Sequence, residues 1–165
     1  MVTSSTLVFD EIGFLPTMEK EAFVHKGGAS WHEPGGREFA IHFRELVREG
    51  IRQDYTYHVD RGKLDLLLLK NAERLGSQVI QGVAVKQILY EGTKAVGVRA
   101  NLGGKDVDLT SKIVVDASGR NTMIGRQLNM KKNDPIFNQY AVHAWFENVH
   151  RGDIDETYDY IHIYF

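Results

Sequence analysis

The sequence predicts a mixed α/β fold, and three observations lead to that prediction. Strand-like and helix-like patterns follow one another in the order strand, helix, strand, β-meander, strand. The last of these strands, residues 112–115, is a β-branched run of the kind that a sheet covers on both faces. It leads into a turn at residues 116–119 and then into a short helix. A chain of 165 residues, 42% of them hydrophobic, can bury a core of ordinary size.

The first third is predicted to contain two short helices followed by strands. Apolar residues recur at helical spacing up to Gly13, and residues 18–22 form a further helical turn. Residues 22–31 have the pattern of one strand, and the PGG sequence at 34–36 is a turn between strands. The next strand, residues 39–43, alternates in polarity. Its apolar positions are expected to face a core: Phe39, Ile41 and Phe43.

The middle of the chain gives the clearest local signals. Residues 57–61 form a short strand with a charged exit, and residues 62–76 form an amphipathic helix that ends at a glycine. Strand-like runs follow in close succession, separated by glycine-containing turns: residues 78–80, 83–90, 95–102 and 107–109. Two later segments alternate in polarity and are predicted strands of a second sheet: residues 140–149 and 158–165.

The turn at residues 116–119, with the sequence DASG, suits an anionic or richly hydroxylated ligand. Gly119 has no Cβ, so a ligand or a second backbone can approach there. Asn121 and Thr122 are expected to cap the following helix, which leaves free N–H groups and a positive helix end at the turn. The alternative is a plain strand-to-helix connection, in which Asp, Ser and Gly are also common.

Two motifs give the chain a resemblance to a known family. VDRGKLD at residues 59–65 and VVDASGR at residues 114–120, with the elements between them, resemble the central part of flavin monooxygenases of the p-hydroxybenzoate hydroxylase class. Within that class the sequence is similar to flavin-dependent halogenases and their FAD-dependent oxidoreductase relatives. The resemblance covers residues 14–165. It implies an FAD/NAD(P)-binding fold of the p-hydroxybenzoate hydroxylase type, here partial, with a β-meander and a substrate-domain sheet.

The resemblance also implies a division of the chain. Residues 1–56 would be a segment of the substrate domain, residues 57–135 a segment of the FAD-binding domain, and residues 136–165 a segment of the substrate-domain sheet. A dinucleotide site needs a G-x-G-x-x-G turn between the first strand and the first helix, and this chain has none. The sequence therefore looks like an internal fragment of a larger enzyme.

The same resemblance assigns cofactor-binding residues. Arg61 would lie against FAD, and Val85 would hold the adenine through its backbone. The DASG turn would lie at the phosphate and ribose region, through Asp116, Ala117, Ser118 and Gly119. The residues themselves leave alternatives open: Arg61 as a solvated cation paired with Asp60 or Asp65, and Val85 as a plain core residue of a strand.

Lys26, within FVHKGG at residues 23–28, is the catalytic candidate. In flavin halogenases a lysine at the matching place meets hypohalous acid and either donates a hydrogen bond to it or becomes a haloamine. That role requires an amine that is desolvated yet still able to donate hydrogen bonds. The alternative is an ordinary exposed strand lysine, because lysine is rarely buried without a partner.

The implied enzyme uses reduced FAD, O2 and halide to halogenate an electron-rich aromatic substrate, either free or tethered to a carrier. A flavin reductase would supply the reduced FAD. One alternative is a related flavin monooxygenase or a geranylgeranyl-reductase-like oxidoreductase. The other is a non-catalytic remnant or binding module that keeps the fold without the flavin.

Composition excludes several other classes. The net charge of −2 leaves no electrostatic footprint for nucleic acid. No run reaches the roughly 18 apolar residues of a membrane span. The absence of cysteine removes disulfides and thiolate chemistry, and is typical of a cytoplasmic protein. None of the seven histidines forms an H-x-x-x-H or H-E-x-x-H pattern, so the sequence predicts no metal site.

Overall fold

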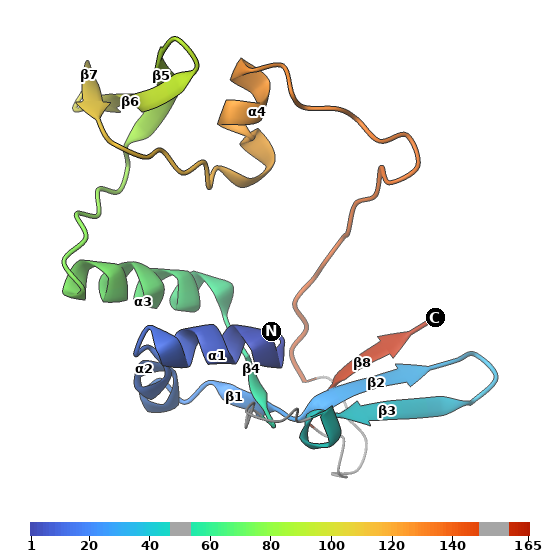
Figure 1. Ribbon diagram of the computed structural model, residues 1–165. Coiled ribbons are helices and arrows are strands. Elements are labelled where there is room, and N and C mark those ends of the chain that lie inside the picture. Colours follow the sequence, from blue (N-terminus) through green and yellow to red (C-terminus); the bar gives the residue numbers. More distant parts are fainter. Residues whose placement is uncertain (47–53, 149–158) are drawn as a thin grey trace. The chain divides into compact units, whose positions relative to one another are not determined.

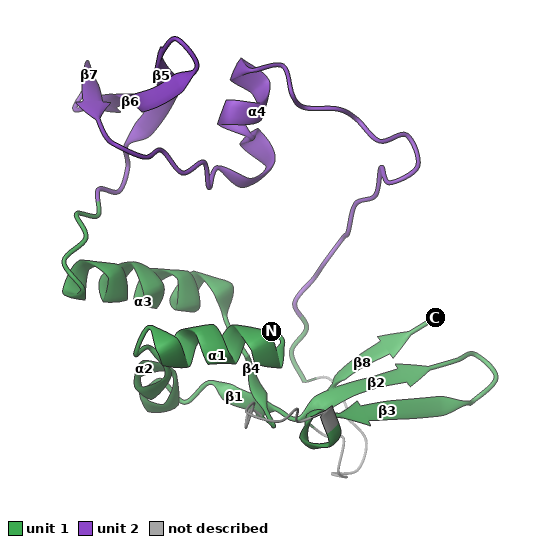
Figure 2. Cartoon of the chain, in the orientation of Figure 1, with its two compact units in different colours: residues 1–79, 146–165 green, residues 80–145 purple. Residues whose placement is uncertain are grey.

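The structure, a computed structural model, describes residues 1–46, 54–148 and 159–165. These residues form two compact units (Figure 2). Unit 1 comprises Met1–Val79 and Phe146–Phe165, and unit 2 comprises Ile80–Trp145. No helix in the described part of the chain is long and apolar enough to cross a membrane.

Unit 1 opens with the two helices that the sequence predicts. Helix α1 spans Thr3–Glu11 and helix α2 spans Leu15–Lys20 (Figure 1). Gly13 separates them at a φ of +65°, a conformation that favours glycine. Pro16 lies in the first turn of α2, where its missing N–H leaves no helical hydrogen bond unmade.

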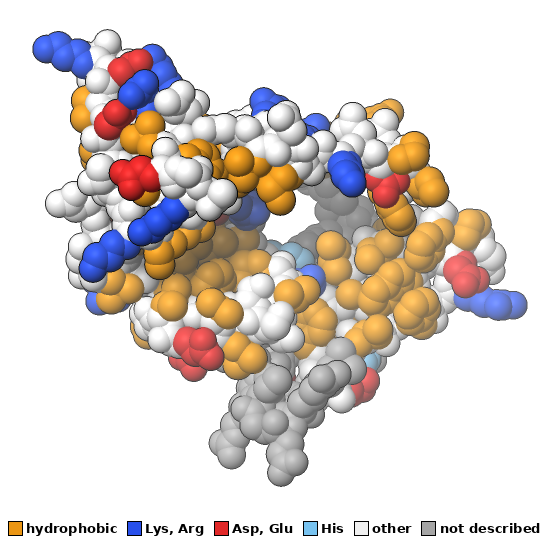
Figure 3. Space-filling model, turned by 45° about the horizontal axis from the view of Figure 1, so that its top comes forward, with side chains coloured by type: hydrophobic (Ala, Val, Ile, Leu, Met, Phe, Trp, Pro, Cys, Tyr) orange, Lys and Arg blue, Asp and Glu red, His pale blue; other side chains and the backbone are white. Residues whose placement is uncertain are grey.

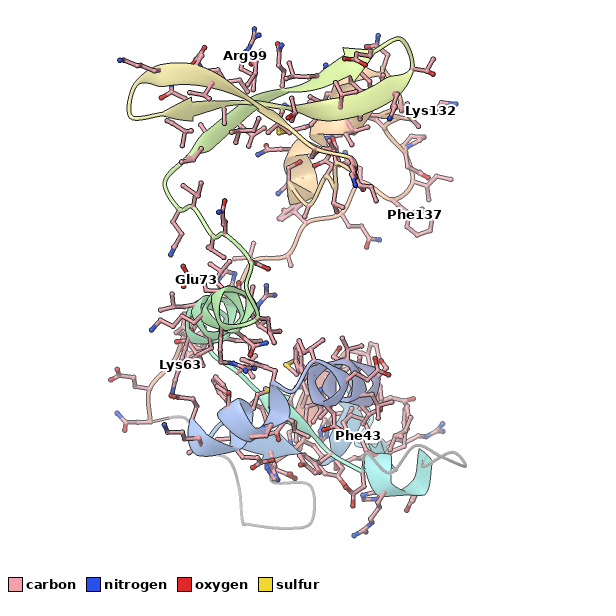
Figure 4. The ribbon with its side chains drawn as sticks, turned by 60° about the vertical axis from the view of Figure 1, so that its left-hand side comes forward. Phe43, Lys63, Glu73, Arg99, Lys132 and Phe137 are labelled. Carbon is pink, nitrogen blue, oxygen red and sulfur yellow. The ribbon has the colours of Figure 1, made fainter. Side chains whose placement is uncertain are left out.

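Helix α3 spans Arg61–Arg74 and confirms the predicted amphipathic helix. Asp60 is its N-cap, and the Asp60 carboxylate accepts a hydrogen bond of 3.1 Å from the backbone N–H of Lys63. The Lys63 ammonium in turn pairs with Glu21 at 2.9 Å and lies 5.1 Å from the centre of the Phe23 ring (Figure 4). These contacts hold the first turn of α3 against the end of α2.

The core of unit 1 lies between α1, α2, α3 and strand β4, Thr56–His58. Its buried members are Phe14, Met18, Tyr57 and Leu64. The ring of Phe9 meets Phe14 edge-on, with 5.5 Å between the ring centres. The helices and β4 thus pack around one apolar interior, which fixes β4 and the strand that pairs with it.

The strand predicted over residues 22–31 is two strands, and this part of the prediction is wrong. Strand β1, Val24–Lys26, pairs antiparallel with β4, whereas strand β2, Gly28–His32, belongs to another sheet. Gly27 lies between them. Its N–H donates to the Asp159 carboxylate at 3.0 Å, and its carbonyl accepts from Phe43 N–H at 2.8 Å. These two bonds take the backbone of Gly27 out of the β1–β4 ladder.

The second sheet of unit 1 has the order β3-β2-β8. Strand β3, Glu38–His42, runs antiparallel to β2 and leads into the 3-10 helix η1, Phe43–Leu46. Strand β8, Ile161–Tyr164, runs parallel to β2 and confirms a strand near the end of the chain; residue 158 lies outside the described residues. The prediction that Phe39 faces a core is wrong: its ring stacks on Trp31 with 4.9 Å between ring centres, but Phe39 is 54% exposed.

Unit 2 contains the predicted meander. Strands β5 (Ala84–Glu91), β6 (Lys94–Leu102) and β7 (Lys105–Thr110) form an antiparallel sheet in that order. Helix α4, Met123–Gln127, packs on β5, and Arg99 points from the opposite face of the sheet (Figure 4).

The side-chain amide of Gln127 completes the free edge of β5. It accepts from Ile88 N–H at 3.0 Å and donates to Ile88 C=O at 2.7 Å, as a neighbouring strand would do. Helix α4 is therefore fixed to the meander by a polar clamp as well as by packing.

Three predicted strands do not form among the described residues: 78–80, 112–115 and 140–148, residue 149 lying outside the described part. A β-branched or alternating run becomes a strand only beside a second strand, and no described segment pairs with these. Most of their apolar side chains are exposed, with Val115 at 82% and Trp145 at 86%. Hydrophobic side chains accordingly occupy much of the visible surface (Figure 3).

Candidate functional site

A cavity of about 510 Å³ lies within unit 2, between the meander and the DASG turn. Its size is typical of small-molecule sites. Residues of β5, of β6 and of the segment before helix α4 line it. Four of the six residues predicted to bind the cofactor are among them: Val85, Asp116, Ala117 and Ser118. The structure therefore brings together residues that lie some thirty positions apart in the sequence.

A second cavity of about 560 Å³ adjoins the first and shares Val85, Asn121 and Met123 with it. Lys86 and Arg126 also line this second cavity. The two hollows together form a groove along the start of β5 and the start of α4. Lys86 pairs with Asp106 at 2.7 Å, so Arg126 is the cation of this groove that could meet an anionic ligand.

Val85 lies at a β-bulge. It pairs with Ala100, and the next pair along is Gln87 with Arg99, so Lys86 has no residue opposite it in β6. Bulges of this kind interrupt a ladder and re-aim the chain next to binding sites. The Val85 side chain is 41% exposed, which contradicts the alternative of a plain core residue. The bulge leaves backbone groups beside Val85 outside the β5–β6 ladder, where a ligand could contact them.

The DASG turn is held by its own aspartate. The Asp116 carboxylate accepts hydrogen bonds from Ser118 N–H at 3.0 Å, from the Ser118 hydroxyl at 2.5 Å and from Ile124 N–H at 2.8 Å. The Ser118 Oγ accepts from Met123 N–H at 3.2 Å. Asp116 and Ser118 therefore cap α4 from the far end of the turn.

The expected caps Asn121 and Thr122 are wrong. Thr122 has a left-handed backbone with φ +44°, and its side chain makes no capping hydrogen bond. Within the described part of the chain its buried Oγ1 has no hydrogen-bond partner. A β-branched residue in this conformation is strained, and such strain gathers at ligand sites. The N–H groups of Met123 and Ile124 are occupied by the turn, so the expectation of free donors there is wrong as well.

Gly119 begins the 3-10 helix η2, Gly119–Asn121, with a φ of +59°. A Cβ at this position would meet no atom of the described residues within 4 Å. The positive φ, and not a close neighbour among the described residues, therefore explains why a glycine stands at position 119. The open space beside it leaves room for a ligand.

Asp116→Asn is expected to lower the Tm at neutral pH. Hydrogen bonds, chiefly from the Ser118 hydroxyl, hold the pKa of Asp116 below its ordinary value of 3.8. A carboxyl whose pKa is lower in the folded chain stabilises the fold above its unfolded pKa, and this contribution is lost as the pH falls through the folded pKa. The Tm difference between wild type and variant should therefore shrink below about pH 4.

Thermal unfolding followed by circular dichroism at pH 7 and pH 3.5 measures this difference. Glu91→Gln, at an exposed acid that ends β5, is the matched control and should change the Tm little at either pH. A difference for Asp116→Asn that is the same at both pH values would contradict the role of the charge.

Lys26 is a buried lysine, which contradicts the alternative of an exposed strand residue. It is 7% exposed at the end of β1, and its Nζ donates to the Met1 carbonyl at 3.2 Å. The Nζ lies 5.6 Å from the centre of the Phe43 ring. Burial lowers the pKa of Lys26, because desolvation disfavours the ammonium form. This is the environment that a reactive amine requires.

Two fully buried hydroxyls lie near the backbone of Lys26. Thr56 is its partner across the β1–β4 ladder, and Thr6 donates to the Thr56 hydroxyl at 2.9 Å. The Thr56 hydroxyl donates in turn to the Val2 carbonyl at 3.3 Å. Sequence reasoning missed this threonine pair, because its members lie 50 positions apart and carry no motif.

The neighbouring residue on β1, His25, belongs to a polar cluster. Its ring stacks on Tyr55 at 4.2 Å, and its Nε2 lies 3.4 Å from the Glu19 carboxylate. The Tyr57 hydroxyl also donates to Glu19, and burial raises the pKa of Tyr57. The cluster holds β1 and β4 together, and it fixes the strand that carries Lys26.

Arg61 lies in unit 1, outside the group of residues around the cavity. Its guanidinium makes two hydrogen bonds of 3.1 Å to Asp65, one turn further along α3. The side chain is 76% exposed, so this pair contributes little to stability. Pairing with Asp65 was one of the alternatives that the sequence left open, whereas Asp60 serves as the helix cap.

Comparison with known proteins places the chain in a family. The sequence profile of the tryptophan halogenase family matches residues 38–151. The 1H-pyrrole-2-carbonyl-(peptidyl-carrier protein) chlorinase of Pseudomonas fluorescens is 39% identical over 183 residues, which cover 100% of this chain and 41% of that protein. The chain thus spans less than half the length of this relative.

Solved structures agree with this result. The myxobacterial chondrochloren halogenase, described as an FAD-dependent halogenase, matches with a TM-score of 0.66 and 28% identity over 74% of this chain and 28% of its own. A flavoprotein/dehydrogenase from Cytophaga hutchinsonii matches with a TM-score of 0.71 and 25% identity over 82% of this chain and 33% of its own. The chain shares the mixed α/β fold of these flavoproteins, and it belongs to the tryptophan halogenase family.

Proposed function

We propose that this chain is the central part of a flavin-dependent halogenase that acts on an electron-rich aromatic substrate in the cytoplasm. The buried amine of Lys26 is the observation that carries the proposal. The Lys26 side chain is 7% exposed at the end of a three-residue strand, and burial lowers its pKa, which makes the neutral, nucleophilic amine more accessible. Halogen transfer gives that amine a chemical purpose, which family membership supports.

The groove in unit 2 fits part of an FAD molecule. Its volume is that of an ordinary ligand site, and the bulged backbone at Val85 and the DASG turn form its walls. Val85 would hold the adenine through its main chain, and the turn from Asp116 to Gly119 would lie at the ribose and phosphates. Reduced FAD, when bound, supplies the reaction of O2 with halide that yields hypohalous acid.

Lys26 handles the electrophile in this proposal. In one route the ammonium donates a hydrogen bond to hypohalous acid and orients it toward the substrate. In the other route the neutral amine displaces hydroxide from the halogen, and water and an N-halo-lysine form. The aromatic carbon then takes the halogen and loses a proton, which restores the amine. A lowered pKa favours the second route, because only the neutral amine is nucleophilic.

The decisive experiment assays the full-length protein with FAD, a flavin reductase, NADH and either chloride or bromide. Free tryptophan, a free phenol and a pyrrolyl thioester on a carrier protein are the test substrates. Mass spectrometry is expected to show a halogen isotope pattern on at least one of them. The carrier-bound pyrrole is included because the chlorinase relative is named for that substrate. Flavin turnover that yields only hydroxylated or reduced products contradicts the proposal.

A flavin oxidoreductase without halide chemistry is the second candidate. The similarity to a flavoprotein/dehydrogenase supports it, because that similarity covers 82% of this chain. The groove in unit 2 serves both candidates equally. The assay for halogenated product separates them, since an oxidoreductase of this kind would form none.

Arg61 is proposed to contact the flavin in the full-length enzyme. The proposal rests on the resemblance of VDRGKLD and on the exposure of the guanidinium, which is available for a ligand. Arg61→Ala is expected to lower the flavin content after gel filtration and to change the Tm little. Lys70→Ala, an exposed cation further along α3, is the control. Full flavin retention with a large loss of stability would show that Arg61 is structural.

A further inference from the structure

Two histidines and a glutamate gather on one face of the β3-β2-β8 sheet. His32 of β2 faces Glu38 of β3 in the antiparallel register. His162 of β8 is the parallel partner of Ser30, two residues before His32 and therefore on the same face. One ligand atom from each of the three residues lies within 4.8 Å of the others.

The contacts within this cluster are specific. His32 Nε2 and His162 Nδ1 are 2.9 Å apart. On the other side of the same ring, His32 Nδ1 lies 3.5 Å from Glu38 Oε2. The Ser30 hydroxyl donates to Glu38 Oε1 at 2.7 Å, and the Tyr164 ring stacks on His32 at 4.4 Å. Glu38 and the His32 ring are thus held in place before any ligand arrives.

We propose that His32 Nε2 and His162 Nδ1 bind one divalent transition-metal ion of the Zn²⁺ class, and that the Glu38 carboxylate orients His32 from its Nδ1 side. Imidazole nitrogens are donors that Zn²⁺ prefers, and a carboxylate beside the other ring nitrogen of a metal-bound histidine strengthens binding. Mg²⁺ and Ca²⁺ prefer oxygen ligands and suit this set poorly. Water would complete the coordination, because the cluster lies at the surface of the sheet.

A small adjustment admits the ion. Two nitrogens bound at about 2.0–2.1 Å to a tetrahedral ion lie roughly 3.3 Å apart. The ring nitrogens therefore separate by a few tenths of an ångström from their present 2.9 Å as the ion replaces the shared proton. A small rotation of the rings about χ2 supplies a movement of this size.

The position of the cluster predicts what the metal does. His32 and His162 are 130 positions apart, and they belong to neighbouring strands that run parallel. An ion between them joins β8 to the β2–β3 hairpin and closes a long stretch of chain. Metal binding should therefore raise thermal stability and not flavin content, which makes the test independent of the proposed halogenase activity.

The test uses the protein purified without a polyhistidine tag and treated with a chelator. Calorimetric titration with ZnCl2 is expected to give one ion per chain, and the Tm is expected to rise in saturating Zn²⁺ but not in Mg²⁺. Titration with CoCl2 should give the visible absorption of a four-coordinate site. Binding should weaken at pH 5, because imidazole must be neutral to bind a metal.

Variants locate the site. His32→Ala and His162→Asn are each expected to lower Zn²⁺ affinity, and Glu38→Gln to lower it by about 10–100-fold. His143→Ala, an exposed histidine of unit 2, is the matched control and should bind Zn²⁺ as the wild type does. His162→Asn keeps the proposal testable if His32→Ala fails to fold, since His162 is exposed. Equal affinity in His162→Asn and wild type, or an equal loss in His143→Ala, overturns the proposal.

Discussion

Lys26→Ala in the full-length enzyme is expected to abolish halogenated product while flavin reduction and reaction with O2 continue. The amine is the only group of Lys26 that can carry a halogen, and alanine removes it. The chemistry of the flavin does not involve this side chain, so its rates should stay near those of the wild type. We expect product formation to fall by at least a hundredfold, about 2.7 kcal/mol in the barrier.

Stopped-flow absorbance follows flavin oxidation in this experiment, and mass spectrometry follows the product. Lys26→Arg should fail nearly as completely, because a guanidinium stays protonated and does not form the haloamine with comparable ease. Lys20→Ala, an exposed lysine at the end of α2, is the control and should leave both rates unchanged. Halogenated product at the wild-type rate in Lys26→Ala would remove the lysine from the mechanism.

A stability effect must be separated from this result. Within the described part of the chain, the Nζ of Lys26 donates a hydrogen bond to the Met1 carbonyl and lies over the Phe43 ring. Alanine also removes buried methylenes of the lysine side chain and leaves the Met1 carbonyl without this donor, so a modest fall in Tm is expected for Lys26→Ala. Lys26→Met keeps most of this volume while removing the amine, so it should lose halogenation with a Tm near that of the wild type. A large fall in Tm would make the loss of activity uninformative.

Local signals account for the parts of the fold that the sequence predicts. Helix α3 has an aspartate cap, an apolar face and a terminal glycine, all within the seventeen residues from Asp60 to Gly76. The meander has turns at Gly92 and at Gly103, both with positive φ. Each of these elements is complete within its own segment, and contacts between residues close in sequence decide it.

Elements that depend on distant partners are predicted badly. Residues 112–115 have the composition of a buried strand, but Ile113 is 79% exposed, because no described segment pairs with it. The caps of α4 were assigned to the two residues before the helix, whereas Asp116 reaches the helix from seven residues before its first residue, Met123. Residue type alone predicts a preference for capping, whereas the capping hydrogen bond also depends on where a partner in another segment lies.

The same distinction applies to the sites. Motif spacing led to Asp116 and its neighbours and to Val85, and the cavity in unit 2 brings them together. The burial of Lys26 could not be read from FVHKGG, since it depends on Phe43 and on the chain around Met1. Likewise, the histidine cluster has no sequence pattern, because its members come from three strands and only register aligns them.

The second large effect is on stability, and it concerns Gly28, two residues after Lys26. Gly28→Ala is expected to destabilise unit 1 strongly. A Cβ at Gly28 would collide with the Ile41 carbonyl oxygen and with the ring of Tyr160. The first of these is backbone of the paired strand β3 and cannot move without breaking the β2–β3 ladder. Overpacking of this kind costs about 1–3 kcal/mol, which lowers Tm by several degrees in a chain of this size.

Gly35→Ala is the matched control for this prediction, since it makes the same chemical change seven residues away in the same hairpin. Among the described residues, a Cβ at Gly35 meets no atom within 4 Å, and its backbone is not in the left-handed region. Its Tm should equal or slightly exceed that of the wild type, because alanine restricts the unfolded chain. Thermal unfolding followed by circular dichroism measures both variants. Equal Tm values for Gly28→Ala and Gly35→Ala would show that β2 and β3 do not approach closely at Gly28. A selective loss in Gly28→Ala would explain why a second glycine follows Lys26: it lets Tyr160 and β3 pack directly against the start of β2, next to the strand that presents the amine.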